Sequence, residues 1–179
     1  ILAQARKSSQ DVVVTSEREV SKYNMNFIDL AENKIVTEEV TLRNALKSKA
    51  TLTRKRPTAY LLLPSQEKLI KRLKTLGVEV QKLDRSKNIN VEKYIIKDYY
   101  RDLNTYEKVH RQEVTTHIDT VQKQFPEGTF VVYLDQKNAG LIIETLEPEA
   151  ANSFISFGVI TTKQGEELPY YRYLNAQEL

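Results

Sequence analysis

The chain has 179 residues, of which 40% are hydrophobic and 28% charged, and this composition is typical of one soluble globular domain. Its net charge of +3 is too small to indicate a nucleic-acid partner. It has no cysteine, which excludes disulfides and cysteine zinc sites, and it has no apolar run near the roughly 18 residues that span a membrane.

The first ten residues, ILAQARKSSQ, lack the basic start and apolar stretch of a signal peptide. Their small and apolar side chains instead predict the tail of a helix that belongs to a preceding domain. We therefore expect residues 1–10 to be this tail and residues 11–179 to form a single α+β domain.

The next segment is predicted to be extended. Residues 12–14 form a short β-branched run, and Tyr23, Met25 and Phe27 alternate with asparagines. A period of two is typical of a half-buried strand, so we expect one face of this strand to be packed. The apolar residues between 35 and 42 suggest further extended structure.

A basic run follows, with five cations and no acid between residues 47 and 56. Such a run could contact phosphate or an acidic surface, or it could be a charged loop beside a guarded edge strand. The five cations are Lys47, Lys49, Arg54, Lys55 and Arg56.

The segment RPTAYLLL, residues 56–63, predicts a strand, and a helix is expected over residues 65–76. Ser65 is a suitable N-cap, and Gly77 can end the helix because it adopts a positive φ without steric cost. Leu69, Ile70, Leu73 and Leu76 fall at helical spacing and predict the buried stripe. A strand beginning at residues 78–80 would complete a β-α-β unit.

The remainder is predicted to be mostly β. Residues 109–125 form a long extended segment, the turn Pro126-Glu127-Gly128 follows, and residues 129–134 form a strand, which together suggest a hairpin. A second helix is expected over residues 138–146, ended by Pro148. The predicted fold is therefore α+β, with a mixed or antiparallel sheet, a β-α-β unit and two main helices.

Residues for catalysis are scarce. His110 and His117 are the only histidines, and their odd separation on a strand directs them to opposite faces. A shared metal would need a bulge, and histidine-based acid–base chemistry has equally little support. With five glycines the chain has no phosphate-binding loop. The sequence therefore predicts no catalytic, cofactor-binding or metal-binding residue.

Two groups of side chains are candidates for an interaction surface. The acids Glu144, Glu147 and Glu149 could flank a substrate or bind calcium weakly, although a solvated helix end is the simpler interpretation. Tyrosines in a loop-like region could contact peptide or carbohydrate, although packing would explain them as well. These tyrosines are Tyr99, Tyr100 and Tyr106.

Two segments resemble a known family. RPTAYLLL with the following EKLIKRLKTLGVEVQKL, and FPEGTFVVYLDQ with the later LEPEA, are similar in order and spacing to the C-terminal region of bacterial zinc carboxypeptidases of the carboxypeptidase A type. The resemblance covers about residues 56–158. It implies a non-catalytic accessory domain that packs on an N-terminal peptidase domain of the same protein and stabilises it, in an extracellular or cell-envelope protein.

The chain also departs from that family. The His-x-x-Glu zinc motif, the third zinc ligand and the catalytic glutamate are absent, and Thr75-Leu76-Gly77 replaces the frequent Leu-His-Gly. No catalytic role is therefore carried over, and zinc is implied for the parent peptidase domain alone. The alternatives are a free-standing peptide- or carbohydrate-binding module and an enzyme whose site is completed by a partner chain.

Overall fold

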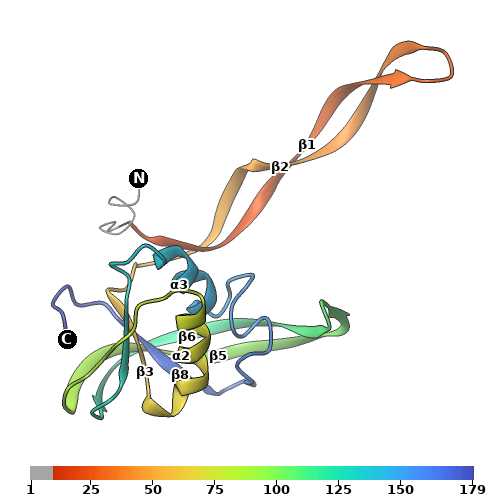
Figure 1. The fold of residues 1–179 in the computed structure, drawn as a ribbon. Coiled ribbons are helices and arrows are strands. Elements are labelled where there is room, and N and C mark those ends of the chain that lie inside the picture. The colour runs from red at the N-terminus through yellow and green to blue at the C-terminus, as the bar shows by residue number, and fades with distance from the viewer. Residues whose placement is uncertain (1–9) are drawn as a thin grey trace.

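A computed structural model describes residues 10–179, in which a long hairpin projects from a body made of the remaining strands and the helices (Figure 1). The helix tail expected over residues 1–10 lies outside the described residues except for Gln10, which is in a bend. The strands are β1 (Val12–Asp29), β2 (Lys34–Arg54), β3 (Ala59–Leu62), β4 (Gln81–Lys82), β5 (Lys87–Tyr106), β6 (Val109–Phe125), β7 (Phe130–Tyr133) and β8 (Glu167–Tyr173). The helices are a short 3₁₀ helix (Pro64–Gln66), α2 (Glu67–Thr75) and α3 (Ala139–Leu146).

The body contains one six-stranded sheet with the order β4-β7-β3-β8-β5-β6, in which all paired neighbours are antiparallel. Strands β3 and β4 are both antiparallel to β7, which lies between them, so they are parallel to each other and α2 connects them. The predicted β-α-β unit is therefore present, with one strand inserted. By the same reasoning α3 connects the parallel strands β7 and β8 around β3. The α+β prediction holds, although the fold is mainly β.

Alternate residues of the central strands enter two different cores, as the pleat of a strand requires. Tyr60 and Leu62 of β3 face the side that α2 and α3 cover, whereas Ala59 and Leu61 face a second cluster on the opposite side. That second cluster includes Phe125 from the end of β6. Because β3 is buried on both sides, its four residues are all apolar or aromatic.

Helix α2 differs from its prediction at both ends. Pro64, Ser65 and Gln66 form the preceding 3₁₀ helix, so Gln66 precedes the first α-helical residue and the predicted Ser65 N-cap is wrong. Leu73 is fully buried as expected, but Leu76 is 47% exposed because it lies at the C-cap, beyond the sheet-facing turn. Gly77 ends the helix with φ of +80°, as predicted.

The predicted hairpin of residues 109–134 is wrong. Strand β6 has the predicted bounds, but it pairs with β5, while β7 pairs with β3 and β4. The chain reverses between β5 and β6 at Glu107 and Lys108, which both have positive φ (51° and 67°). Two such residues form the tight turn whose twist suits a hairpin, and glutamate and lysine give little warning of it in the sequence.

Strands β1 and β2 form a separate two-stranded sheet that extends away from the body (Figure 1). We call residues 12–54 the arm. At its base, Val12 and Val14 pack against Ala150, which follows α3. The prediction of a strand around Tyr23 is confirmed, but the prediction that this strand is half-buried is wrong, since Tyr23 is 52% exposed. Nothing in residues 10–179 covers the outer part of the arm.

Candidate functional site

The three predicted glutamates lie in different surroundings at the end of α3. Glu144 is on the helix surface, where its carboxylate accepts hydrogen bonds from the backbone N–H and side-chain amide of Asn152, both at 2.9 Å. Glu147 follows the helix and its side chain is fully buried, and Glu149 exposes only a tenth of its side chain. The solvated helix end is therefore wrong for Glu147 and Glu149, and Glu147 does not lie on a surface.

Arg54 is the residue that pairs these two acids. It ends β2 at the base of the arm, and its side chain reaches the turn after α3. Its Nη1 donates to Glu147 Oε2 at 2.8 Å and to Glu149 Oε2 at 2.7 Å, while its Nη2 donates to Glu149 Oε1 at 2.7 Å. The fork of a guanidinium suits this bidentate contact with Glu149. Arg54, one of the five cations of the predicted basic run, is therefore buried and has a structural role.

Glu147 has two further partners in the body. The hydroxyl of Tyr60 donates to Glu147 Oε1 at 2.6 Å, and Arg172 Nε lies 3.4 Å from the same oxygen. Arg172 also donates to Glu92 Oε2 at 2.5 Å and to the carbonyl oxygen of Lys55. The buried carboxylate therefore lies between two arginines, one from the arm and one from β8. We call Arg54, Tyr60, Glu147, Glu149 and Arg172 the ionic cluster.

The pKa values follow from these contacts. Burial raises the pKa of the Glu149 carboxyl, but the hydrogen bonds and charge of Arg54 and the Thr116 hydroxyl outweigh it, so the pKa lies below its usual value. Burial and the Glu147 charge raise the pKa of Tyr60 well above normal. Burial alone would lower the pKa of Arg54, but Glu149 and Glu147 raise it instead. Glu149 and Arg54 therefore stabilise each other's charged forms.

Two fully buried hydroxyls adjoin the ionic cluster. Tyr94 and Tyr170 pack edge to face at 5.7 Å, and neither hydroxyl has a hydrogen-bond partner within residues 10–179. Burial and the Glu147 charge raise the pKa of both hydroxyls well above normal. The hydroxyls of Tyr94 and Tyr170 therefore stay neutral, and neither is available as a nucleophile or a general base.

The predicted tyrosine group is only partly accessible. Tyr99, Tyr100 and Tyr106 lie on β5 rather than in a loop. Tyr99 packs against the core and donates to Gln112 Oε1 at 2.9 Å, so it is a packing residue. Tyr100 and Tyr106 are exposed, and Tyr106 contacts Phe157 edge to face at 6.5 Å. Tyr100 and Tyr106 are thus the accessible members of the group.

The two histidines contact different residues. His110 Nδ1 lies 3.0 Å from the carbonyl oxygen of Asp102, and His117 Nε2 lies 2.8 Å from Asp119 Oδ1. Among residues 10–179, no group of three or more His, Asp or Glu side chains is arranged to hold a metal ion.

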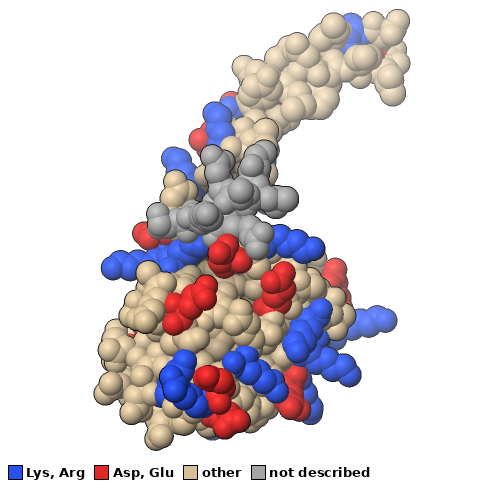
Figure 2. Space-filling view, turned by 60° about the vertical axis from the view of Figure 1, so that its left-hand side comes forward, with Lys and Arg blue, Asp and Glu red and all other residues tan. Residues whose placement is uncertain are grey.

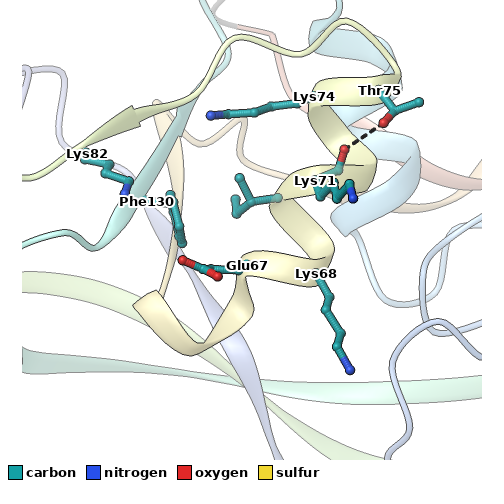
Figure 3. Close-up of a pocket in the computed structure, with 8 residues that line it drawn as sticks. Glu67, Lys68, Lys71, Lys74, Thr75, Lys82 and Phe130 are labelled. Carbon is teal, nitrogen blue, oxygen red and sulfur yellow. Dashed lines mark hydrogen bonds between the residues drawn. The ribbon is translucent and has the colours of Figure 1, made fainter.

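A shallow groove of about 630 Å³ runs beside α2 (Figure 3). Ile70 and Phe130 supply its apolar surface, and the Lys82 Nζ lies 4.9 Å from the Phe130 ring centroid. Lysines of α2 line it as well, namely Lys68, Lys71 and Lys74. These cations could attract an anion, but the groove holds no histidine, serine or cysteine for nucleophilic or acid–base catalysis.

The chain is similar to fungal proteins named carboxypeptidase 2. The identity is 32% to the proteins of Trichophyton tonsurans and Trichophyton equinum and 31% to that of Trichophyton rubrum, each over 165 residues. These matches cover 92% of this chain but 31% of each relative, so the chain spans about a third of the length of the curated relatives it matches. The relatives agree with the carboxypeptidase resemblance, but they are fungal and do not support a bacterial origin.

No family model matches the chain, and no solved structure matches it significantly. No helix within residues 10–179 is both long and apolar enough to cross a membrane.

Proposed function

We propose that this chain is a non-catalytic region of a zinc carboxypeptidase-like metallopeptidase, and that it packs on the peptidase domain and stabilises it. One observation carries the proposal: proteins named carboxypeptidase 2 match nearly the whole chain while two-thirds of their own length lies outside the match. The chemistry of a peptidase would then reside in that remaining length.

The described side chains support a scaffold role. Buried ionisable groups are candidates for catalysis, and among residues 10–179 the most buried acid is Glu147. It is held between Arg54 and Arg172, and its side chain is fully buried. A cavity of about 400 Å³ is lined by the next residues, Pro148 and Glu149, but Glu147 itself does not line it. A carboxylate that is saturated in this way stabilises the fold, whereas a zinc peptidase needs a metal with one open position.

The experiment compares three proteins: this chain, the longer polypeptide that contains it, and the longer polypeptide without residues 11–179. We expect zinc-dependent release of C-terminal residues from a peptide by the longer polypeptide and no turnover by this chain. Removal of residues 11–179 should lower the melting temperature of the remaining region. Peptide turnover by the isolated chain would overturn the proposal, as would a longer polypeptide without peptidase activity.

A further inference from the structure

The outer part of the arm has one mainly apolar face, whereas the other face is mainly polar but also carries the exposed Val20, Ile28 and Ile35. In the antiparallel register Tyr23 is opposite Val40 and Phe27 is opposite Val36, and directly paired residues share a face. The intervening positions carry Asn24, Asn26, Lys22 and their polar partners on the other face. The apolar face consists of Tyr23, Met25, Phe27, Val36, Val40 and Leu42.

This face lacks a partner within residues 10–179. Tyr23, Met25 and Phe27 are exposed, and Figure 2 shows mostly uncharged side chains on the side of the outer arm that faces the viewer. A two-stranded hairpin is marginally stable in water, and a third strand or a packed face is needed to hold it. An amphipathic ribbon of this length is therefore expected to be covered in the functional protein.

The arm belongs to the region shared with the relatives. The match covers 165 of 179 residues, so at most 14 positions fall outside it, whereas the arm spans Val12–Arg54. At least two-thirds of the arm is therefore shared with proteins about three times longer. A segment that is shared in this way is expected to have a structural role in those longer chains.

The charge of Glu38 argues against a second copy of this chain as the partner of the apolar face. Glu38 lies opposite Met25, near the centre of the face, and forms no ion pair with another of residues 10–179. A symmetric contact centred on this face would bring two Glu38 carboxylates together in an apolar interface, which is costly. A different surface with a cation at this position would instead pair with Glu38.

The arm is also anchored firmly at one end. Arg54 connects its base to Glu147 and Glu149 through three short hydrogen bonds, so the base is fixed while the outer part is free of contacts with the body. The base of the arm is therefore held on the body, and the apolar face lies several strand residues beyond it (Figure 1).

We propose that the apolar face of the arm packs against the catalytic region of the longer polypeptide, with a cation of that region opposite Glu38. This inference rests on the proposed function and names the surface through which the two regions meet. The contact is an apolar patch with one charge pair, and the ionic cluster holds the arm in position for it.

Hydrogen exchange followed by mass spectrometry tests the contact in the longer polypeptide and in this chain alone. Amides of the outer arm should exchange at least about tenfold more slowly in the longer polypeptide. The variant Tyr23→Ser/Phe27→Ser should abolish that difference. The matched control Val20→Ser/Ile28→Ser changes two exposed apolar residues of the opposite face and should keep it. Glu38→Lys should reduce the protection, whereas Glu39→Lys, on the polar face, should not.

Three results would overturn the inference: equal exchange of the arm in both proteins, equal loss of protection in the control, or concentration-dependent dimerisation of the isolated chain that protects the arm. A mature polypeptide of only these 179 residues would overturn it too. Peptidase activity is scored separately. Activity with an unprotected arm refutes this contact alone, and a protected arm without activity refutes the proposed peptidase function alone.

Discussion

Replacement of Arg54 by alanine should be among the most damaging single changes in the chain. The side chain is buried and donates three hydrogen bonds to two carboxylates and one, at 2.9 Å, to the Thr116 hydroxyl. Its loss leaves the fully buried Glu147 with Tyr60 and Arg172 only, and leaves Glu149 with no cation.

The size of the effect follows from the burial of the acids. Removal of one partner of a buried ion pair costs about 3–5 kcal/mol, because the remaining charge is desolvated without compensation. For a domain of this length, that corresponds to a fall in melting temperature of roughly 6–20 °C. Arg54→Lys should lose less, since it keeps the charge but not the bidentate fork to Glu149.

Calorimetry and near-ultraviolet circular dichroism are suitable assays. The chain has ten tyrosines and no tryptophan, and Tyr60 and Tyr94 lie at the ionic cluster, so the tyrosine signal reports its packing. The control is Lys49→Ala on the same strand, an exposed change expected to stay within about 0.5 kcal/mol. A loss below about 1 kcal/mol for Arg54→Ala would refute the argument that Glu147 and Glu149 depend on this cation.

The remaining predictions concern packing, pH and metal. Leu73→Ala should destabilise by about 2–5 kcal/mol because Leu73 is fully buried, while Lys71→Ala on the exposed side should stay within about 0.5 kcal/mol; similar urea midpoints would contradict the placement of α2. The pKa of Glu149 is lower in the folded state than its ordinary 4.5, so its ionised form favours folding. The stability advantage of wild type over Glu149→Gln should be complete well above pH 4.5 and shrink as pH falls below it, which urea unfolding at several pH values measures. The isolated chain should hold no stoichiometric zinc by elemental analysis; one tightly held zinc per chain, lost on changing His110 and His117 to Ala, would contradict this.

Several local features were predictable because local chemistry sets them. The apolar spacing of α2 placed Leu69, Ile70 and Leu73 in the core, and Gly77 ended the helix in the conformation that glycine alone adopts without strain. The long strand at residues 109–125 was visible from its β-branched residues. These signals depend on residues within a few positions of one another.

Other features depended on contacts between distant segments. The sequence predicted a solvated helix end at Glu147, but Arg54, 93 residues earlier, buries and pairs it. Nothing near either residue in the sequence indicates this pairing. The partner of β6 was equally hidden, since the turn at Glu107 and Lys108 carries no glycine or asparagine to mark a hairpin.

The sequence by itself indicated that residues 12–14, 23–27, 56–76 and 109–146 contain strands and helices, although not all of their ends, and it showed which faces of these segments are apolar. Only the tertiary structure decided which apolar faces are packed. Alternation in residues 23–27 shows that one face of the strand is apolar, yet burial needs a second surface, and the fold places this strand on a projecting arm. The periodicity of the sequence shows whether a face is apolar. Whether that face is buried depends on which other parts of the chain pack against it.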